Sequence, residues 1–281
     1  MITNFETNKV LLAKGITFHA YVNATKHLLE IMHNKEIEWG FLPFTSSPYH
    51  IWARDYMPVQ VNKDKFVRFI YNPDYLKNNP EYKPNTSGIL SELGVRVTDS
   101  DIIIDGGNVI SCGEKVIMTD KIYRENPHYD HNLLIDRLSQ LLESEIILMP
   151  EDYYDEYGHA DGMVRFVDRN TIIGNKLENE FANWRKEMQE VIAKYNLKYI
   201  DVPLLTDMKD RKHPLSAQGV YVNFLEVNNL IVLPVFGRPE DDEVFKIMEE
   251  TFPDRVIERI NYNDVALEGG LVNCTTWVMR K

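Results

Sequence analysis

Hydrophobic and polar positions along the chain predict strands and amphipathic helices that follow one another in turn. The apolar run at 9–13 is typical of a strand, and residues 23–35 form a helical pattern with Leu28, Ile31 and Met32 on one face. Residues 36–44 predict a second strand. The alternation at 59–61 and 66–70, separated by a polar break at 62–64, predicts a β-hairpin.

The same unit then recurs along the chain. A turn leads into a strand, a second turn leads into another strand, and an amphipathic helix follows. We expect such units to begin at Asp55, at Asp105, at His159, at residues 217–219 and at residues 268–270, with helices near 132–142, 178–195 and 240–251. In the fourth unit the apolar run 220–224 is the expected first strand. The five starts lie about 50 to 60 residues apart, a spacing that is typical of radial or linear repeat architectures.

The two ends of the chain complement each other. The fifth unit lacks a closing strand and helix, whereas the amino-terminal strand and helix belong to no unit. A closed ring, in which the amino-terminal pair completes the last unit, removes the exposed strand edges of an open array. We therefore predict an α/β fold, a five-bladed α/β propeller of ββαβ repeats, with residues 1–281 forming a single domain. Residues 72–84, which include three prolines, are the expected loop over its mouth.

Composition narrows the class of partner. The 281 residues include 43 acidic and 31 basic side chains, for a formal charge of −12, which argues against nucleic acid and suits a cationic ligand. Two cysteines cannot form a disulfide framework or a zinc cluster. There is no signal peptide and no apolar run of membrane-spanning length, so we predict a cytoplasmic protein without a membrane partner.

A ring of this kind would bring one polar segment of each unit to a common centre. These segments contribute Asp55, Asp105, His159 with Asp161, Asn223, and Cys274. A cysteine, a histidine and carboxylates without metal-ligand spacing suggest nucleophilic catalysis. Two carboxylates can hold a guanidinium by charge-assisted hydrogen bonds, which presents its carbon to a thiol while an imidazole transfers protons.

Each of these residues also has a structural reading. A lone cysteine such as Cys274 is more often a small buried hydrophobe than a nucleophile, and an aspartate beside a turn is often a cap. His159 could be a structural histidine, and Asn223 could orient a loop. Cys112 is expected in the core. His128 and His131 could bind a metal, but no third ligand is evident, so we predict no metal site.

The motifs resemble the guanidino-group-modifying (pentein) superfamily, and within it the agmatine deiminase and bacterial peptidyl-arginine deiminase group. The matching segments are 52–55 (Trp-Ala-Arg-Asp), 105–108 (Asp-Gly-Gly-Asn), 158–161 (Gly-His-Ala-Asp), 221–224 with 233–237, and the two glycines ahead of Cys274. The resemblance implies Cys274 as the nucleophile, His159 as general acid and then base, and Asp55 with Asp161 as the guanidinium-holding pair. Trp52, Asp105 and Asn223 are the candidate substrate contacts. No cofactor is implied.

The resemblance leads to hydrolytic deimination as the expected reaction, through a covalent thiouronium. The expected substrate is agmatine, which would give N-carbamoylputrescine and ammonia. Deimination of free or peptidyl-arginine, amidino transfer to an amine, and a pentein that only binds are the alternatives. This chain has Asn273 before the nucleophile and Trp277 after it, where agmatine deiminases usually carry His and Gln; these departures concern the part of the substrate remote from the guanidine. The sequence leaves a homo-oligomer open.

Overall fold

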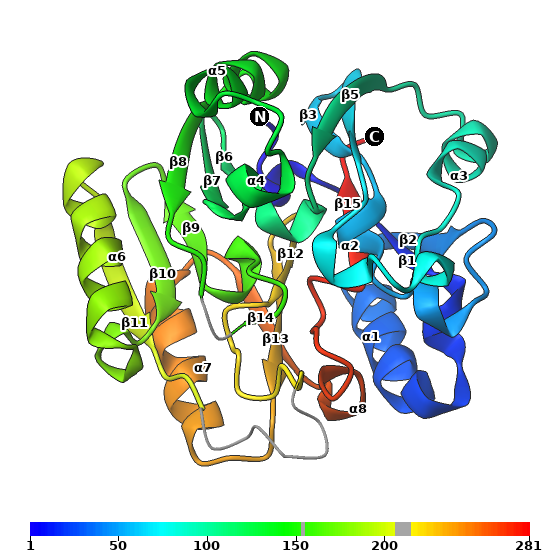
Figure 1. Cartoon of the computed structure of the whole chain (residues 1–281). Helices are drawn as coiled ribbons and strands as arrows, with labels where there is room; N and C mark the ends of the chain where they lie inside the picture. The colour runs from blue at the N-terminus through cyan, green and yellow to red at the C-terminus, as the bar shows by residue number, and fades with distance from the viewer. Residues whose placement is uncertain (153–154, 206–214) are drawn as a thin grey trace.

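The computed structural model describes residues 1–152, 155–205 and 215–281. Within these ranges the named strands form five three-stranded sheets, arranged as a ring with helices outside it (Figure 1). The sheets consist of β15 (Thr276–Met279), β1 (Lys9–Ala13) and β2 (Glu38–Leu42); β3 (Val59–Asn62), β4 (Lys65–Ile70) and β5 (Thr98–Ile103); β6 (Ile110–Cys112), β7 (Lys115–Thr119) and β8 (Glu145–Met149); β9 (Val164–Asp168), β10 (Thr171–Asn175) and β11 (Lys198–Val202); and β12 (Leu225–Val227), β13 (Leu230–Val235) and β14 (Val256–Asn261).

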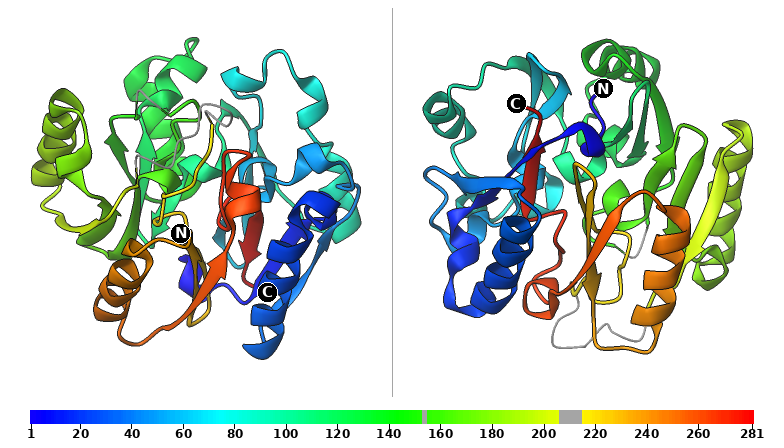
Figure 2. Two further views of the ribbon diagram at one scale, coloured as in Figure 1. Left: turned by 90° about the horizontal axis from the view of Figure 1, so that it is seen from below. Right: turned by 180° about the vertical axis from the view of Figure 1, so that it is seen from behind.

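All five sheets have the same connection pattern. The middle strand pairs antiparallel with one neighbour and parallel with the strand that follows it in the chain, as β4 does with β3 and β5. The antiparallel neighbour is the preceding strand in four sheets and β15 in the sheet of β1. Parallel neighbours need a crossover connection, which here contains a helix. The long crossover helices are α1 (Val22–Asn34), α3 (Thr86–Leu93), α5 (His131–Leu142), α6 (Ala182–Lys194) and α7 (Glu240–Thr251), and Figure 2 shows them on the periphery. Three short helices, α2 (Ala53–Tyr56), α4 (Lys121–Glu125) and α8 (Asn263–Ala266), lie in connections.

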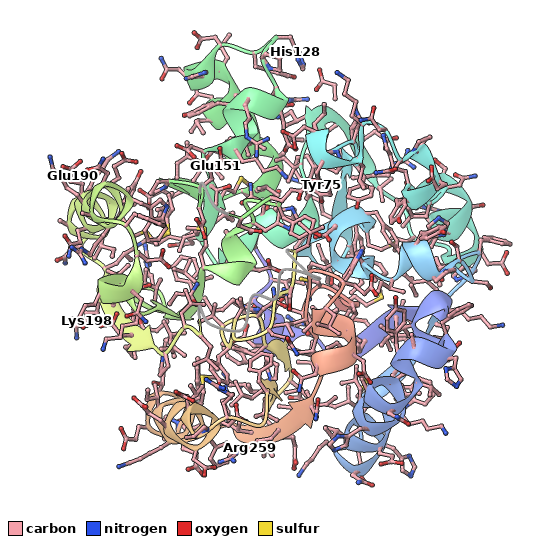
Figure 3. All side chains as sticks on the ribbon, turned by 60° about the horizontal axis from the view of Figure 1, so that its bottom comes forward. Tyr75, His128, Glu151, Glu190, Lys198 and Arg259 are labelled. Atoms are coloured by element: carbon pink, nitrogen blue, oxygen red, sulfur yellow. The ribbon has the colours of Figure 1, made fainter. Side chains whose placement is uncertain are left out.

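The two ends of the chain lie in one sheet. Strand β1 pairs antiparallel with β15, so that Leu11 lies opposite Trp277, and it pairs parallel with β2. The amino-terminal strand and helix therefore complete the unit that the carboxyl-terminal segment begins. In Figure 3 the ribbon colours run around the ring from blue to orange, and the red carboxyl-terminal segment lies beside the blue amino-terminal one.

The predicted helices near 23–35, 132–142, 178–195 and 240–251 are confirmed by α1, α5, α6 and α7. In α1 the expected apolar face, Leu28, Ile31 and Met32, is buried in the core because its spacing keeps these side chains on one side. Helix α3 was not predicted. Its signals are the Asn85 side chain, which caps the backbone N–H of Gly88, and Gly94, which ends the helix in the left-handed conformation.

One strand prediction is wrong. Residues 220–224 form a turn rather than a strand, and only Val220 makes an isolated bridge, to Leu204. The first strand of this unit is β12, which begins at Leu225. The apolar side chains of Tyr221, Val222 and Phe224 are buried in the core all the same, so the hydrophobic run reports burial and not strand conformation.

Two further observations complete the fold. The loop expected at 72–84 contains two single 3₁₀ turns, η5 (Asp74–Leu76) and η6 (Pro80–Tyr82), and Cys112 packs half-buried against a hydrophobic cluster. None of the helices in the described ranges has the length and apolar character of a membrane span.

Candidate active site

The polar residues predicted to converge are carried by short turns that precede the first strand of each unit. Asp55 lies in α2 before β3, and Asp105 directly precedes η7 (Gly106–Asn108) before β6. His159 directly precedes η8 (Ala160–Gly162), which contains Asp161 and leads to β9. Cys274 lies in the turn 272–275 that enters β15. Because these turns occupy equivalent places in the repeat, their side chains meet although they are far apart in sequence.

A cavity of ≈ 700 Å³ lies at this meeting point. Its lining includes all four predicted catalytic residues, Cys274, His159, Asp55 and Asp161, together with Trp52 and Asn223. Asp105 is not part of the lining. The loop 72–84 contributes Tyr75, Leu76, Asn79 and Tyr82, so it borders the cavity as predicted, and Figure 3 places Tyr75 toward the centre of the ring.

Cys274 is buried at the base of the cavity, in contact with two polar side chains. Its Sγ accepts a hydrogen bond from Nδ2 of Asn223 at 3.2 Å and lies 3.7 Å from Oδ2 of Asp161. Burial, followed by the charges of Asp161 and Asp55, raises the pKa of the Cys274 thiol well above its ordinary value. The site therefore favours the neutral thiol of Cys274.

His159 lies between two carboxylates that come from different units. Its Nε2 is 2.7 Å from Oδ2 of Asp105, and its Nδ1 is 3.7 Å from Oδ1 of Asp55. Burial and the charge of Lys121 lower the pKa of His159, but Asp55 and Asp105 together outweigh them and raise it to about 9. The imidazole is thus protonated at neutral pH and can donate a proton.

Glycine at position 107 lets the backbone pass directly beneath these groups. A Cβ there would lie 2.7 Å from both Oδ1 of Asp55 and Nδ1 of His159. The backbone N–H of Gly107 instead donates to Oδ1 of Asp55 at 3.0 Å. Burial raises the pKa of Asp55 to about 7, so a cation that enters the site would favour its ionised form.

Asp161 is held by a pair of residues that the sequence did not reveal. Nδ2 of Asn273 donates to Oδ2 of Asp161 at 2.7 Å, and Oδ1 of Asn273 accepts from Arg54 at 3.1 Å. The backbone N–H of Arg54 also donates to the carbonyl of Cys274 at 3.0 Å. Burial lowers the pKa of Arg54 to about 10, yet the guanidinium stays charged at neutral pH. Position 273 thus orients a carboxylate beside the nucleophile. The expectation that this departure concerns the remote part of the substrate is wrong, because Asn273 contacts Asp161 next to Cys274.

Asp105 has a different place from the one predicted. It is fully buried behind His159, where its Oδ2 accepts from His159, from Lys121 at 2.7 Å and from Tyr75 at 3.2 Å. Burial alone would raise the pKa of Asp105, but Lys121 and His159 lower it to about 2. A carboxylate in this position holds the imidazole, and Asp105 does not line the cavity.

The walls of the cavity are aromatic and acidic. Six tyrosines among the residues that the structure describes line it, namely Tyr21, Tyr49, Tyr71, Tyr75, Tyr82 and Tyr157. Trp52 lies against Gly270, where an added Cβ would come within 2.5 Å of the indole, so this glycine lets the indole approach the nucleophile loop. Beyond the inner carboxylates the lining includes Glu156 and Glu268, and no lysine or arginine occurs among the lining residues that the structure describes.

The other residues singled out in the sequence lie away from this site. Trp277 is buried in the core, where its Nε1 donates to the carbonyl of Pro58. His131 stacks on Tyr123, and Figure 3 places His128 at the outer edge of the ring. In the described part of the chain no three His, Cys, Asp or Glu side chains are grouped as metal ligands would be.

Residues 2–279 match the Porphyromonas-type peptidyl-arginine deiminase family. The chain belongs to this family. Among curated relatives, the agmatine deiminase of Pseudomonas aeruginosa is 24% identical over an alignment of 217 residues, which covers 66% of this chain and 59% of that enzyme. The chain thus spans about three fifths of the length of the curated relatives it matches.

Solved structures agree on the fold of this family member. The agmatine deiminase of C. jejuni superposes with a TM-score of 0.83 at 17% sequence identity, and the match covers 100% of this chain and 95% of that chain. A Cys-to-Ser variant of that enzyme, with substrate bound, superposes with a TM-score of 0.79. At these identities the likeness establishes the fold, so the five-bladed α/β propeller predicted from the repeat is confirmed.

Proposed function

We propose that the protein hydrolyses the guanidino group of a small cationic substrate to a ureido group and ammonia. The observation that carries this proposal is that a buried thiol, an imidazole and two carboxylates line one cavity, although they come from residues 55 to 274. The names of the family and of its curated relatives, which are deiminases, support the same reaction class.

In this mechanism Asp55 and Asp161 hold the guanidinium of the substrate by paired hydrogen bonds. Burial and the two carboxylates keep Cys274 protonated. The arriving positive charge offsets the carboxylates, so the thiol releases its proton to solvent as the substrate binds. The thiolate then forms a bond to the guanidinium carbon. His159, protonated in the resting site, gives its proton to one amino group of the tetrahedral adduct, and the carbon–nitrogen bond breaks to release ammonia.

The remaining half-reaction uses the same imidazole as a base. The covalent intermediate is a thiouronium on Cys274, and the neutral His159 removes a proton from water as the water oxygen attacks the same carbon. Collapse of this second adduct breaks the carbon–sulfur bond, the hydroxyl proton passes to the departing sulfur of Cys274, and the carbonyl of the ureido product remains. In sum, one water molecule is consumed and one amino group leaves as ammonia. No step requires a metal or an organic cofactor.

Agmatine is the substrate that we propose first, with N-carbamoylputrescine as the product. It carries a second positive charge and no carboxylate, which suits a lining with Glu156 and Glu268 and with no basic residue among its described members. Free arginine would bring a carboxylate into these acidic surroundings. An arginyl peptide is the second candidate, because a cavity of ≈ 700 Å³ has room for more than a small diamine chain.

The test is to incubate the purified protein with agmatine, arginine and an arginyl peptide, and to measure ammonia and the ureido product. We expect turnover of agmatine, with Cys274→Ala inactive and Cys112→Ala unchanged. Ammonia formed without an added amine would separate hydrolysis from amidino transfer. Lack of turnover with all three compounds would contradict the proposal and would favour a protein that only binds. A cytoplasmic location stays a prediction, and a homo-oligomer stays open.

A further inference from the structure

A buried lysine that the mechanism above does not use lies behind the imidazole. Lys121 begins α4, and its ammonium group is fully buried. Nζ lies 2.7 Å from Oδ2 of Asp105 and 3.2 Å from Oε1 of Glu125, and it stands 4.7 Å from the centre of the Tyr75 ring. A buried ammonium is costly unless it is paired and hydrogen-bonded, and here two carboxylates and a ring face satisfy it.

Lys121 and His159 share one hydrogen-bond acceptor. Lys121 and His159 both bind the same oxygen of Asp105, each at 2.7 Å, while the other oxygen, Oδ1, has no hydrogen-bond partner among the described residues. All three donors to Asp105, counting Tyr75, therefore pull on Oδ2. The rotation of the carboxylate about its bond, and with it the direction of Nε2 of His159, depends on where Lys121 holds that oxygen.

We propose that Lys121 is a positioning residue for the deimination. It holds Asp105 so that the imidazole of His159 keeps one orientation through both half-reactions. Glu125 is the second residue of this arrangement, because its carboxylate pairs with the same ammonium group. The inference rests on the proposed function, because it takes His159 to be the group that transfers protons.

The two residues of α4 have opposite electrostatic effects on the imidazole. The positive charge of Lys121 opposes protonation of His159, so its removal should raise the pKa of His159 above about 9. Glu125 partly neutralises Lys121, so its removal should expose His159 to the full ammonium charge and lower the pKa of His159. Loss of Lys121 should also free Asp105 to rotate, which moves the imidazole away from the leaving amino group.

Other ionisable groups face His159, Lys121 and Glu125, and a substitution of Lys121 or Glu125 leaves them in place. Around His159 they are Asp55, Tyr75 and Tyr157, with Asp161 and Cys274 across the cavity. On the side of α4, the backbone N–H of Asp74 approaches Glu125 at 3.4 Å, and Glu151 lies beside Gly158 next to the stem of Lys121. Since none of them is altered, a change in the titration of His159 reports on α4.

The experiment measures kcat and kcat/KM against pH for the full-length protein with agmatine, for wild type, Lys121→Met and Glu125→Gln. For Lys121→Met we expect kcat to fall about 10- to 100-fold with KM within about twofold, as for a misplaced catalytic group. The pH at which kcat/KM falls on the basic side (the basic limb) should rise by about one unit in Lys121→Met and should be lower than in wild type in Glu125→Gln. A limb that stays at the wild-type pH in both variants, or that moves the same way, would overturn the proposal.

Two additions keep the test independent of folding and of the substrate. Asp241→Asn is the matched control, because Asp241 is a buried carboxylate that accepts hydrogen bonds from Tyr221 and from backbone N–H groups of 236–238. It should lower the unfolding temperature and leave the basic limb unchanged. The imidazole of His159 can also be titrated by NMR in Cys274→Ala. If wild type turns over no guanidine, the proposed function fails, while opposite shifts in this titration would still support the role of Lys121.

Discussion

A matched pair of alkylating probes should show that a cation activates Cys274. 2-Chloroacetamidine carries a positive charge, whereas 2-chloroacetamide is a neutral compound of nearly the same shape. Burial keeps the thiol protonated, and Asp161, whose Oδ2 lies 3.7 Å from Sγ, and Asp55 add to this effect. We expect the neutral probe to label Cys274 slowly and the cationic probe to label it fast.

The size of the difference follows from the spacing in the site. A cation held about 4 Å from the sulfur, at an effective dielectric constant of about 20, favours the thiolate by about 4 kcal/mol, or about 1000-fold in population. A thiolate of lower basicity is also less nucleophilic, which removes about half of this factor on a logarithmic scale. The amidine should therefore label Cys274 at least about 30-fold faster than the amide.

The assay is mass spectrometry of the intact protein and of its peptides after timed exposure to each probe. Cys112 is the internal control, since it is half-buried outside the cavity, and its two labelling rates should be similar. Asp161→Asn should speed labelling of Cys274 by the amide, because one charge that holds the proton is gone, and should slow labelling by the amidine. Equal rates of the two probes at Cys274 would refute the reasoning.

Further predictions concern the carboxylate pair, the glycines, the core and cofactors. Asp55 must be ionised to hold the guanidinium, and its pKa is raised to about 7, so kcat/KM should fall about tenfold per pH unit below that value; an unchanged rate down to pH 5 would contradict this. Gly270→Ala should cost at least about tenfold in kcat/KM, because the added methyl meets the indole of Trp52 at 2.5 Å, while the circular dichroism spectrum stays that of wild type. Leu28→Ala, in the core far from the cavity, should lower the free energy of unfolding by about 2–5 kcal/mol in urea titrations and leave kcat at low temperature unchanged. Dialysis against EDTA should leave turnover unchanged. A loss of turnover that is reversed by adding a divalent cation would count against the proposed mechanism.

The parts of the site that repeat were predictable, because repetition makes a local pattern carry long-range information. Asp55, His159, Asp161 and Cys274 each follow a turn at the same place in a unit, so a closed ring requires them to meet. The closure itself was visible as an unfinished last unit and an unassigned first strand. In the structure β1 pairs antiparallel with β15.

The parts that do not repeat could not be predicted in this way. Asn273 reaches Asp161 and Arg54 across the closure of the ring, and nothing in the local sequence announces either contact. Asp105 has the same place in its unit as the other acids, yet Lys121 and His159 draw it behind the imidazole. The repeat therefore locates the side chains near the axis, whereas their partners decide which of them face the cavity.

The electrostatics of the cavity explain why its nucleophile can rest as a thiol. With Asp55 and Asp161 beside it, a permanent thiolate at Cys274 would place three negative charges together in a buried site, which is unfavourable. A guanidinium removes that obstacle only while it is bound, so the charge that the carboxylates recognise is also the charge that prepares the sulfur for attack. Selectivity for cations and activation of Cys274 are then one effect, and a neutral compound of the same shape should bind weakly and react slowly.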